Sequence, residues 1–595
     1  MPDALAPFRL VERIRGRIAR GENYAEEVAE LAEALESNEE LKRRCQCLLA
    51  HQMLLDERLL AVETNRLFSV WGGVLSRCAR VWWRTGHRLR GSVLHPLFAR
   101  AFPAQAYRGW IAGQQAALPS CEAHQATAAG WSYRPTVALL MPAGSTERLA
   151  ETVESVRGQS YPEWQLCVTL NGIADPGEML RGDERIRVTQ AAREGAAEAA
   201  NRAAALASAE YLAVIEPGDR LAPHALHSLV ERLQRAPADI VYSDEDRLEG
   251  EARVRPLFKP DWSPALLESC MYAGRLLAIR SEVFQAAGGF RAVPAYEHDF
   301  LLRAIGVRVE HVPRVLYHRR GERLSVQPAR APLPEDAALT VVICSKTSRL
   351  LEQAVESVQR TRGAVPCGFL VVHHEEGGED RPMRRLLERL GCRVLRYGGP
   401  FHFALMNNLA VERVQTPYVL FLNDDVTAFA PGWCERIVTA LAREDIGVAG
   451  SVLRYRWGAL QHAGIVLGVG DGAAHVGRSS FESEIWPWLT LSRDVSAVTG
   501  ACLGMRTAVF RKLGGFHLEF PNNYNDVDLC LRARAAGYRV VCLGGDELQH
   551  IECSTRAGLT RLIERDRFYE RWGREADPFY SPCLADSERI GLRGG

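Results

Sequence analysis

Short apolar runs alternate with segments of helical spacing through most of this chain. The runs VALLMP, QLCVTLNG and EYLAVIEPGD follow one another from Thr136, and LTVVICSK, GFLVVHHEE and YVLFLNDDV follow from Leu339. Strands that alternate with helices and end in Gly, Asn or Asp predict a parallel, doubly wound sheet of the α/β class. Because such sheets bind ligands at the carboxyl ends of their strands, the residues after these runs are the first candidates for function.

The same pattern divides the chain into regions. Residues 131–320 and 339–595 are predicted to form two α/β domains, here called the first half and the second half, and the second half includes a C-terminal extension. Residues 321–338 have the composition of a linker. Residues 1–130 are predicted to be an α-helical N-terminal region, in which a coiled coil and a helical hairpin both remain open. Its apolar positions recur with helical spacing at Leu41, Cys45, Leu48, Leu55, Leu59 and Val62.

The two halves also match each other. Three short motifs recur in the same order in both: VESV at 153–156 and 355–358, VF and GGF within 283–290 and 509–516, and an Asp followed four residues later by Arg at 299–303 and 528–532. Any one match could be chance, but their common order predicts a duplicated domain.

Composition narrows the class of protein. The 595 residues are 47% hydrophobic and 25% charged, which is ordinary for a globular chain of several domains. Lys and Arg total 73, the same as Asp and Glu, and this balance argues against nucleic acid as a partner. No apolar run approaches the ~20 residues of a membrane-spanning helix, and the first residues lack the apolar core of a secretory signal. The 15 cysteines are scattered without CxxC pairs, which favours a cytoplasmic location.

One segment departs from this charge balance. Residues 64–121 contain eight Arg and no Asp or Glu, with Trp and Phe interleaved. Basic segments with aromatic residues bind the headgroup region of anionic membranes, so peripheral attachment to the inner face of the cytoplasmic membrane is one interpretation. Docking of the arginines on an acidic domain of the same chain is the second. Binding of nucleic acid is a weaker third, because no recognition motif accompanies the charge.

Carboxylates and a histidine in the second half indicate a site for a divalent cation and a base. Asp424 and Asp425 directly follow an apolar run, and His550 lies further along the chain. Oxygen ligands at a strand end suit Mg²⁺ or Mn²⁺ together with substrate phosphates, and an imidazole favours Mn²⁺ slightly. Asp526 is a candidate general base for an attacking hydroxyl. Together these residues are the minimum apparatus for displacing a diphosphate from a sugar carbon.

Each of these residues also has a structural interpretation. An Asp pair after a strand often caps a turn or a helix, a single His is often structural, and Asp528 is the better candidate for capping the helix that begins near Asp526. Their order and spacing, which recur in part in both halves, favour the functional interpretation.

Longer motifs point to a known family. The first half carries YSDED at 242–246, FKPDWSP at 258–264, GGF at 288–290 and HVPRVLYHRR at 311–320. The second half carries GPFHFALMNNLA at 399–410, LFLNDDV at 420–426, QHAGIVLG at 461–468, RDVSAVTGACL at 493–503 and YNDVDLCLRARAAGY at 524–538. In these motifs both halves resemble glycosyltransferase family 2 domains of the GT-A fold. Their tandem arrangement resembles that of bacterial enzymes of O-antigen and other surface-polysaccharide synthesis.

The resemblance implies an inverting transferase that uses a UDP- or dTDP-linked sugar donor with Mn²⁺ or Mg²⁺. It implies that Asp425 and His550 bind the metal and that Asp526 is the catalytic base, with Glu297 in the corresponding place of the first half. The implied donor-binding residues are Ser345, His373, Asn408, Asp424, Asn201 and Asp219. The implied acceptor-side or supporting residues are Asp528, Asp299, His318, Asp244 and Asp246.

Both halves depart from the family pattern. In the first half Gly218 stands opposite Asp425 and has no side chain to bind a metal, although Asp219 follows it, and Asn171 ends a strand that usually carries an acidic pair. In the second half His373 stands where the family usually has an Asp, which leaves the donor nucleobase open. We expect the first half to be either a structural or acceptor-holding domain or a second active transferase.

The expected function is transfer of a sugar by the second half to a hydroxyl of a glycan or lipid-linked glycan acceptor. Two alternatives remain: a bifunctional glycan polymerase with both halves active, and a glycan-binding scaffold with decayed sites. The presence of Asp425, Asp526 and His550 together argues against the scaffold.

Overall fold

The protein is described here from a computed structural model. The described residues are 104–304, 306–321, 332–375, 380–456, 458–478, 480, 486–545, 547–551, 558–574, 576–585 and 591–593. The predicted N-terminal helical region up to residue 103 and residues 322–331 of the predicted linker lie outside them. By its internal contacts, Ala101–Gly595 is one compact unit.

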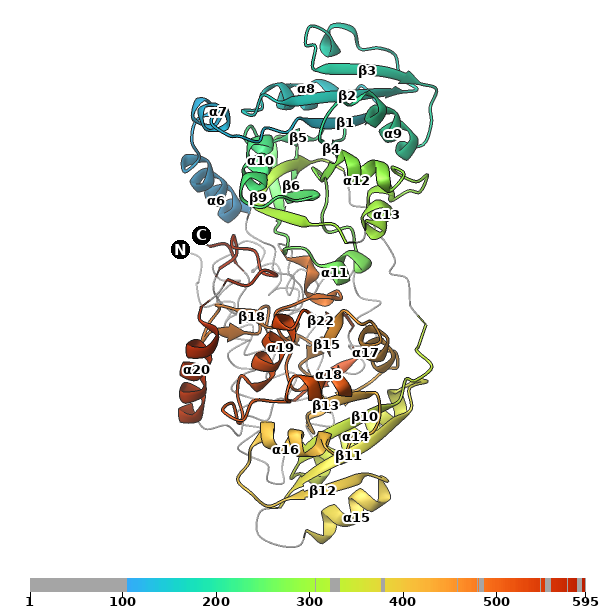
Figure 1. The fold of residues 1–595 in the computed structure, drawn as a ribbon, viewed down its shortest axis with the longest axis vertical. Helices are drawn as coiled ribbons and strands as arrows, with labels where there is room; N and C mark the ends of the chain where they lie inside the picture. The colour runs from blue at the N-terminus through green and yellow to red at the C-terminus, as the bar shows by residue number, and fades with distance from the viewer. Residues whose placement is uncertain are drawn as a thin grey trace, which may run out of the picture. The chain divides into compact units, whose positions relative to one another are not determined.

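The first half is one sheet with helices on its faces (Figure 1). Its strands are β1 (Val137–Ala143), β2 (Trp164–Asn171), β3 (Ile186–Ala191), β4 (Tyr211–Val214), β5 (Arg220–Leu221), β6 (Ile240–Glu249), β7 (Ala252–Leu257), β8 (Ala278–Arg280) and β9 (Val309–Arg319). Its helices are α8 (Leu149–Arg157), α9 (Ala196–Leu206), α10 (Ala225–Arg235), α11 (Pro264–Ser269), α12 (Ser281–Ala286) and α13 (Tyr296–Arg303), with a 3-10 turn at Gly177–Leu180. The strand order is β3-β2-β1-β4-β8-β6-β9-β5, and β7 pairs with β6.

The second half builds its main sheet from corresponding elements. The strands of this sheet are β10 (Leu339–Ser345), β11 (Cys367–His374), β12 (Arg393–Tyr397), β13 (Tyr418–Leu422), β15 (Ile446–Ser451), β20 (Arg493–Asp494), β21 (Cys502–Arg506) and β22 (Arg539–Leu543). The helices are α14 (Ser348–Thr361), α15 (Arg381–Arg389), α16 (Phe403–Val411), α17 (Trp433–Leu441), α18 (Thr507–Lys512), α19 (Asn525–Ala535) and α20 (Gly558–Trp572), with a 3-10 turn at Pro487–Thr490. Smaller sheets contain β14 (Val426–Ala428), β16 (Leu453–Arg454), β17 (Leu460–His462) and β23 (Leu548–His550), and β18 (Val466–Leu467) with β19 (Ala473–Ala474).

The strand order of the second sheet, β12-β11-β10-β13-β21-β15-β22-β20, repeats that of the first through seven strands. The duplication inferred from the motifs is therefore confirmed in the topology. The sheets predicted to be parallel are mixed in the structure. The strands β5, β7 and β20 pair antiparallel with their neighbours. In each half one central strand, β8 or β21, runs antiparallel to both of its neighbours. The carboxyl ends of the parallel strands on either side still meet at one edge.

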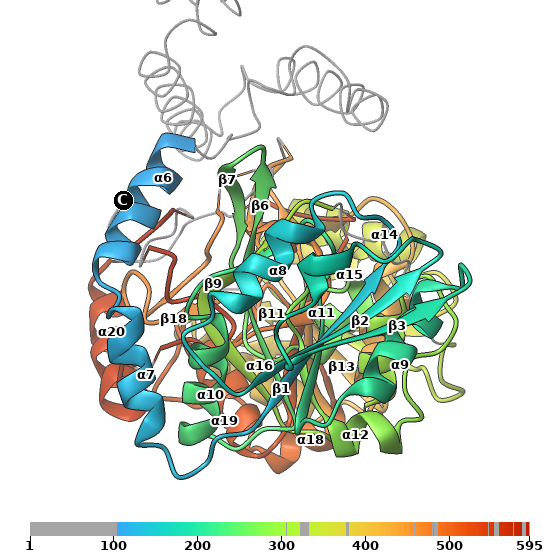
Figure 2. The same ribbon diagram turned by 90° about the horizontal axis from the view of Figure 1, so that it is seen from above.

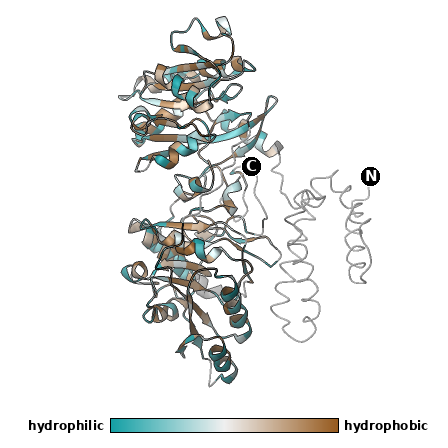
Figure 3. Cartoon of the chain, turned by 90° about the vertical axis from the view of Figure 1, so that its right-hand side faces the viewer, coloured by the Kyte–Doolittle hydropathy of each residue, from teal (hydrophilic) through white to brown (hydrophobic). Residues whose placement is uncertain are grey.

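Burial explains why these segments form strands and helices. The interior strands β1 and β10 are buried along almost their whole length, as strands covered on both faces must be. Helix α14 turns one apolar stripe inward, including Leu351, Val355 and Val358 at helical spacing. Hydrophobic residues (brown in Figure 3) run along the strands, while hydrophilic residues (teal) cover much of the helices. Among the described residues, no helix combines the length and apolar character needed to cross a bilayer.

The end of the Arg- and Trp-rich segment packs on the first half. Helices α6 (Ala104–Ala116) and α7 (Cys121–Ala129) follow one another beside it (Figure 2). Trp110 is 8% exposed and meets the ring of Phe258 edge-on at 5.5 Å. Tyr107 is buried and donates its hydroxyl to Asp246 over 2.6 Å. These two aromatic residues are therefore used in intramolecular docking. The rest of the segment, 64–103, lies outside the described residues.

The two halves share a buried polar junction. The carboxylate of Asp494 accepts hydrogen bonds from the hydroxyl of Ser263 at 2.8 Å and from the backbone N–H of Ala265 at 3.0 Å. Arg539 donates to its other oxygen at 2.7 Å. The indole N–H of Trp488 donates to the backbone carbonyl of Phe258 at 3.0 Å. Because these partners come from both sides of the linker, the junction is part of one folded core.

Candidate active site and its counterpart in the first half

The acidic pair of the second half lies at the end of β13. Asp424 accepts a 2.6 Å hydrogen bond from the hydroxyl of Ser345, the last residue of β10. Burial raises the pKa of Asp424 to about 6, while the Ser345 hydrogen bond acts in the opposite direction. Ser345 stands opposite His373 in the parallel pairing of β10 with β11. Three of the predicted donor-binding residues therefore share one edge of the sheet.

Asp425 and His550 also come together. Val426, the next residue in the chain, pairs with His550 in the antiparallel ladder of β14 and β23. The imidazole Nε2 of His550 lies 3.1 Å from Oδ1 of Asp425, and both side chains are 8% exposed. A carboxylate and an imidazole at this distance form a donor set that suits Mn²⁺ or Mg²⁺.

Other side chains of the described residues do not add to this candidate donor set. Within the described ranges, no group of three or more His, Cys, Asp and Glu side chains is placed to hold a metal ion. This fits a cation that takes its remaining ligands from substrate phosphates and water, as Mg²⁺ and Mn²⁺ sites with one or two protein ligands do.

The candidate base, Asp526, stands in the first turn of α19. Its Oδ2 accepts the backbone N–H of Gly500 at 2.7 Å, and its Oδ1 accepts that of Val527 at 2.9 Å. The next residue after Gly500, Ala501, accepts a 3.0 Å backbone hydrogen bond from Asn423, which directly precedes the acidic pair. One short loop therefore contacts both the strand end with Asp425 and the helix turn with Asp526.

Asp528 has a different setting two residues further on. Its side chain is fully buried, and one oxygen accepts from Arg532 Nε at 2.8 Å. The other oxygen accepts from Trp572 Nε1 at 3.1 Å and forms an ion pair with Nε of Arg571, also at 3.1 Å; both partners belong to α20. Arg532 also donates to the carbonyls of Leu513 and Gly515. These contacts give Asp528 a structural role, but the prediction that it caps the helix is wrong. Helix α19 begins after Tyr524 without a side-chain cap, and Asp528 lies inside the helix, where it binds side chains instead of backbone N–H groups.

The two predicted donor-side asparagines have matching contacts. Asn408 donates to the carbonyl of Phe516 at 2.8 Å and accepts from its N–H at 2.9 Å. Asn201 makes the same two bonds with Phe290. Both amides fasten a helix to the GGF segment in their half. Their contribution to donor binding stays a prediction.

The first half contains a cavity of about 690 Å³ where the corresponding site would be. Asp219 and Glu297 both line it, as does Gly218. The guanidinium of Arg275 pairs there with Glu297 on one side and with Glu216 on the other. The candidate base of this half is therefore engaged by a permanent cation.

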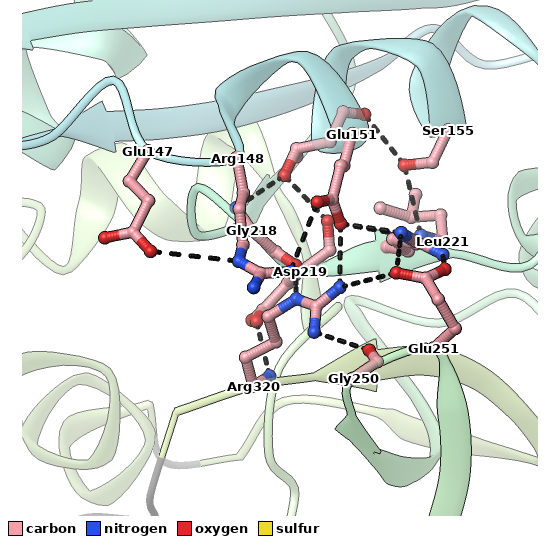
Figure 4. Close-up of polar contacts among 12 residues, drawn as sticks. Glu147, Arg148, Glu151, Ser155, Gly218, Asp219, Leu221, Gly250, Glu251 and Arg320 are labelled. Carbon is pink, nitrogen blue, oxygen red and sulfur yellow. Dashed lines mark hydrogen bonds and ion pairs between the residues drawn. The ribbon is translucent and has the colours of Figure 1, made fainter.

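Arginines also surround Gly218, the position that corresponds to the candidate metal ligand Asp425. A side chain at Gly218 would meet Arg148 and Arg320, each at 3.6 Å, and the positive φ of 91° there favours glycine. Arg320 donates to the carbonyls of Gly218 and Gly250 and to Glu151 (Figure 4). The strand end that carries the acidic pair in the second half is an arginine–carboxylate network in the first.

Asp219 is held within this network. It accepts from the hydroxyl of Tyr317 at 2.7 Å and from the backbone N–H of Arg320 at 2.8 Å. Burial raises the pKa of Asp219 to about 6, and those two hydrogen bonds oppose the shift. Its carboxylate oxygens thus already have protein donors.

The remaining predicted residues of the first half lie apart from the lining of this cavity. His318 pairs with Asp246 at 2.7 Å and lines a separate cavity beside α6 and α7. Asp244 is fully buried and accepts from His311 and from the backbone of Lys259. Asp299 pairs with Arg303 at 2.9 Å, which matches the pair of Asp528 with Arg532.

Two features of these sites were not predicted from the sequence. Gly500 contributes through its backbone N–H, which no side-chain pattern reveals, although it lies in the quoted motif RDVSAVTGACL. Arg275 was not singled out. It stands fourteen residues before Gly289, as Ala501 stands fourteen residues before Gly515, so an alignment on the GGF motifs would have placed an arginine opposite an alanine at the site.

Comparisons with known proteins agree with the duplicated topology. The family model described as "Glycosyl transferase family 2" matches residues 144–285, and the model described as "Glycosyltransferase like family 2" matches residues 337–572. The matches fall on the two halves and together cover more than half of the chain.

Individual relatives are more distant. "Uncharacterized protein y4gI" of Sinorhizobium fredii is 31% identical over 76% of this chain and 58% of its own length. "O-antigen biosynthesis protein RfbC" of Myxococcus xanthus is 29% identical over 80% of this chain and 42% of its own length. This chain thus spans about half the length of these relatives. The crystal structure of S. aureus TarS 1-349 matches 31% of this chain and 60% of its own at 15% identity, with a TM-score of 0.28. From the two family matches and the repeated sheet, the chain belongs to glycosyltransferase family 2 and carries two domains of that family in tandem.

Proposed function

We propose that the second half is an inverting, metal-dependent glycosyltransferase that moves a sugar from a nucleotide-diphospho-sugar to a hydroxyl of a surface-polysaccharide acceptor. The observation that carries this proposal is the loop at 500–501. Gly500 bonds to Asp526, and Ala501 bonds to the strand end that leads to Asp425. This contact supports a single site for the candidate base and the candidate metal ligand.

The donor side of the reaction uses the edge of the sheet. Asp425 and His550 would hold Mn²⁺ or Mg²⁺, which when bound neutralises the charge that develops on the departing diphosphate. Asp424, aligned by the Ser345 hydroxyl, is proposed to contact the ribose or phosphates. His373 lies beside Ser345 on the next strand and is proposed to contact the nucleobase of a UDP- or dTDP-linked donor.

The acceptor side uses Asp526. Its carboxylate takes the proton of the acceptor hydroxyl as the hydroxyl oxygen forms a bond to the anomeric carbon and the bond to the diphosphate breaks. Attack on the face opposite the leaving group inverts that carbon. The hydrogen bonds from Gly500 and Val527 orient the carboxylate before the acceptor arrives. The entropy cost of orienting the base is therefore not part of the activation barrier.

The acceptor is proposed to be a glycan or a lipid-linked glycan. The name of the M. xanthus relative, an O-antigen biosynthesis protein, supports this class. A bifunctional polymerase is the second candidate, and the repeated topology favours it. Arg275 argues against it, because a guanidinium paired with Glu297 opposes transfer of a proton to that carboxylate. We therefore propose a structural or acceptor-holding role for the first half.

A screen of nucleotide sugars on the full chain tests the donor and metal assignments. Each nucleotide sugar is added with and without MnCl₂, and the donors are UDP-glucose, UDP-galactose, UDP-N-acetylglucosamine and dTDP-rhamnose. The thermal unfolding midpoint of the chain and the release of nucleoside diphosphate are measured. We expect at least one donor to stabilise the chain and to be hydrolysed only with Mn²⁺. Asp425→Ala should lose both effects, while the exposed Asp566→Asn should keep them. Equal nucleotide affinity of Asp425→Ala and the unaltered chain in Mn²⁺ would contradict the assignment.

A further inference from the structure

Helix α20 contacts the segment that leads into the helix of Asp526. The carboxylate of Glu564 is 1% exposed and accepts the backbone N–H groups of Asn522 at 2.8 Å and Asn523 at 3.2 Å. The side-chain amide of Asn523 donates to the same carboxylate. One buried carboxylate thus binds two successive peptide groups of a loop, a contact in which each oxygen has a donor.

The same helix face makes two further contacts around Asp526. Phe568, four residues after Glu564, stacks on Tyr524 with the ring centres 4.9 Å apart. Tyr524 precedes α19 and has a positive φ of 58°, which is unfavourable for a tyrosine without support from its surroundings. One turn further along α20, Arg571 and Trp572 bind Asp528. Helix α20 therefore holds the chain both before and after the candidate base.

The first half provides an internal comparison. It repeats the pair of Asp299 with Arg303 at the place of Asp528 with Arg532. Within its described residues, 104–304 and 306–321, no helix follows β9, whereas α20 follows β23 in the second half. We call the contacts of α20 with the start of α19 the clamp. The clamp belongs to the second half, in which Ala501 stands at the position of Arg275.

We propose that Glu564 is a positioning residue for Asp526, and that α20 holds the first turn of α19 so that the carboxylate stays aimed at the acceptor hydroxyl. This inference rests on the proposed function, because it presumes that Asp526 is the base. Glu564 acts through the backbone of Asn522 and Asn523. Without the Glu564 carboxylate, the backbone N–H groups of these two residues lose their hydrogen-bond acceptor. The positive φ of Tyr524 at the start of α19 then loses part of its support.

The test uses the full chain in four forms: unaltered, Glu564→Gln, Glu564→Ala and the control Asp566→Asn on the exposed side of the same helix. Hydrogen–deuterium exchange of residues 522–531 measures the clamp without reference to activity. Turnover of the nucleotide sugar selected by the screen gives kcat, the donor KM and the dependence of kcat/KM on pH. Glu564→Gln keeps the shape of the side chain and serves if the alanine variant does not fold.

We expect faster exchange of the 522–531 segment in both Glu564 variants and the unaltered rate in Asp566→Asn. We expect kcat of Glu564→Gln to fall by about tenfold to hundredfold with the donor KM within about twofold, as for a misplaced catalytic group. The acid limb of kcat/KM should move to higher pH, because a carboxylate that loses the Gly500 N–H becomes easier to protonate.

Faster exchange with unaltered kcat, or a higher KM with unaltered kcat, would overturn the positioning role. Unaltered exchange in both Glu564 variants would overturn the clamp itself. Asp526→Asn, measured beside these variants, separates the two levels of inference. If that variant turned over normally, the proposed function would fail, whatever the Glu564 variants did to exchange.

Discussion

Gly500 donates its backbone N–H to Oδ2 of Asp526 over 2.7 Å. A hydrogen bond from the main chain to an ionised carboxylate is strong and directional, and the loop that provides it is tied to β13 through Ala501. The orientation of the candidate base is thus set by the sheet edge at which the donor is proposed to bind. If binding of the sugar donor shifted that edge, the shift would reach Asp526 through residues 500–501.

Asp526→Asn is expected to abolish transfer. The amide is the same size and can still accept from Gly500, but it cannot take a proton from the acceptor. Turnover should fall by at least about a hundredfold, the contribution of a general base, while Mn²⁺-dependent nucleotide affinity stays within about twofold. Steady-state turnover and calorimetric titration with UDP and MnCl₂ measure the two quantities. Full turnover would remove Asp526 from the mechanism.

Glu297→Gln separates one active half from two. Because Arg275 already engages this carboxylate, we expect the variant to transfer sugar within about twofold of the unaltered rate, since no step of the reaction relies on it. The glutamine keeps an oxygen for the guanidinium. Analysis of product linkages by mass spectrometry and NMR is the measurement. Loss of one linkage in Glu297→Gln and of another in Asp526→Asn would establish the bifunctional polymerase instead.

Asp219→Asn should change how stability depends on pH. Burial raises the pKa of Asp219 to about 6, so between pH 4 and pH 6 the folded chain binds more protons at this group than the unfolded chain does. Stability from this group is therefore lost as pH rises through that window. As pH rises through this window, the free energy of unfolding of the unaltered chain should fall by up to about 3 kcal/mol relative to that of the Asn variant. Each pKa unit corresponds to about 1.4 kcal/mol.

Thermal midpoints of both chains between pH 4 and pH 7.5 measure this difference. Asp175→Asn is a control of opposite sign, because hydrogen bonds from Gly177 and Arg181 lower the pKa of Asp175. In that pair the unaltered chain should gain relative stability as pH rises through the acid range. A pH-independent difference for Asp219→Asn would show that its carboxyl titrates normally.

Asp494→Ala is expected to loosen the junction between the halves. The carboxylate is buried, and its loss leaves Ser263, the Ala265 N–H and Arg539 with fewer partners. We expect the free energy of unfolding to fall by about 3 kcal/mol, as when one partner of a buried pair is removed.

Asp445→Ala provides a matched control for this change. Asp445 also pairs with Arg539, at 2.6 Å, but is 47% exposed, so its loss should cost less than about 1 kcal/mol. Urea unfolding followed by tryptophan fluorescence reports on the junction through Trp488. Equal effects of the two variants would mean that the junction contributes little.

Much of the architecture was predictable because the signals are local or repeated. Apolar runs located the strands, and recurring motifs such as GGF revealed the duplication. The convergence of Ser345, His373 and Asp424 followed from the rule that parallel strands end at one edge. The antiparallel strands β8 and β21 were not predicted, because a short buried strand carries no direction in its composition.

The contacts that distinguish the two halves were less accessible. Arg275 and Glu297 are twenty-two residues apart, and a sequence shows neither their pairing nor the cavity they share. His318 matched His550 in order, yet it pairs with Asp246 and lines another cavity, because it stands opposite Arg220 in the ladder rather than beside Gly218. One step of register along a strand decides which site a side chain joins.

The buried contact of Ser263 with Asp494 bears on how such a chain can evolve. After a duplication, either copy can in principle be exchanged with a relative by recombination at the connecting segment. Here each copy supplies part of the interior of the other. Exchange of one copy would therefore place Ser263 from one protein against whatever residue the other protein carries at position 494. Successful natural chimaeras should therefore inherit both copies together, or retain this serine and this aspartate across the crossover.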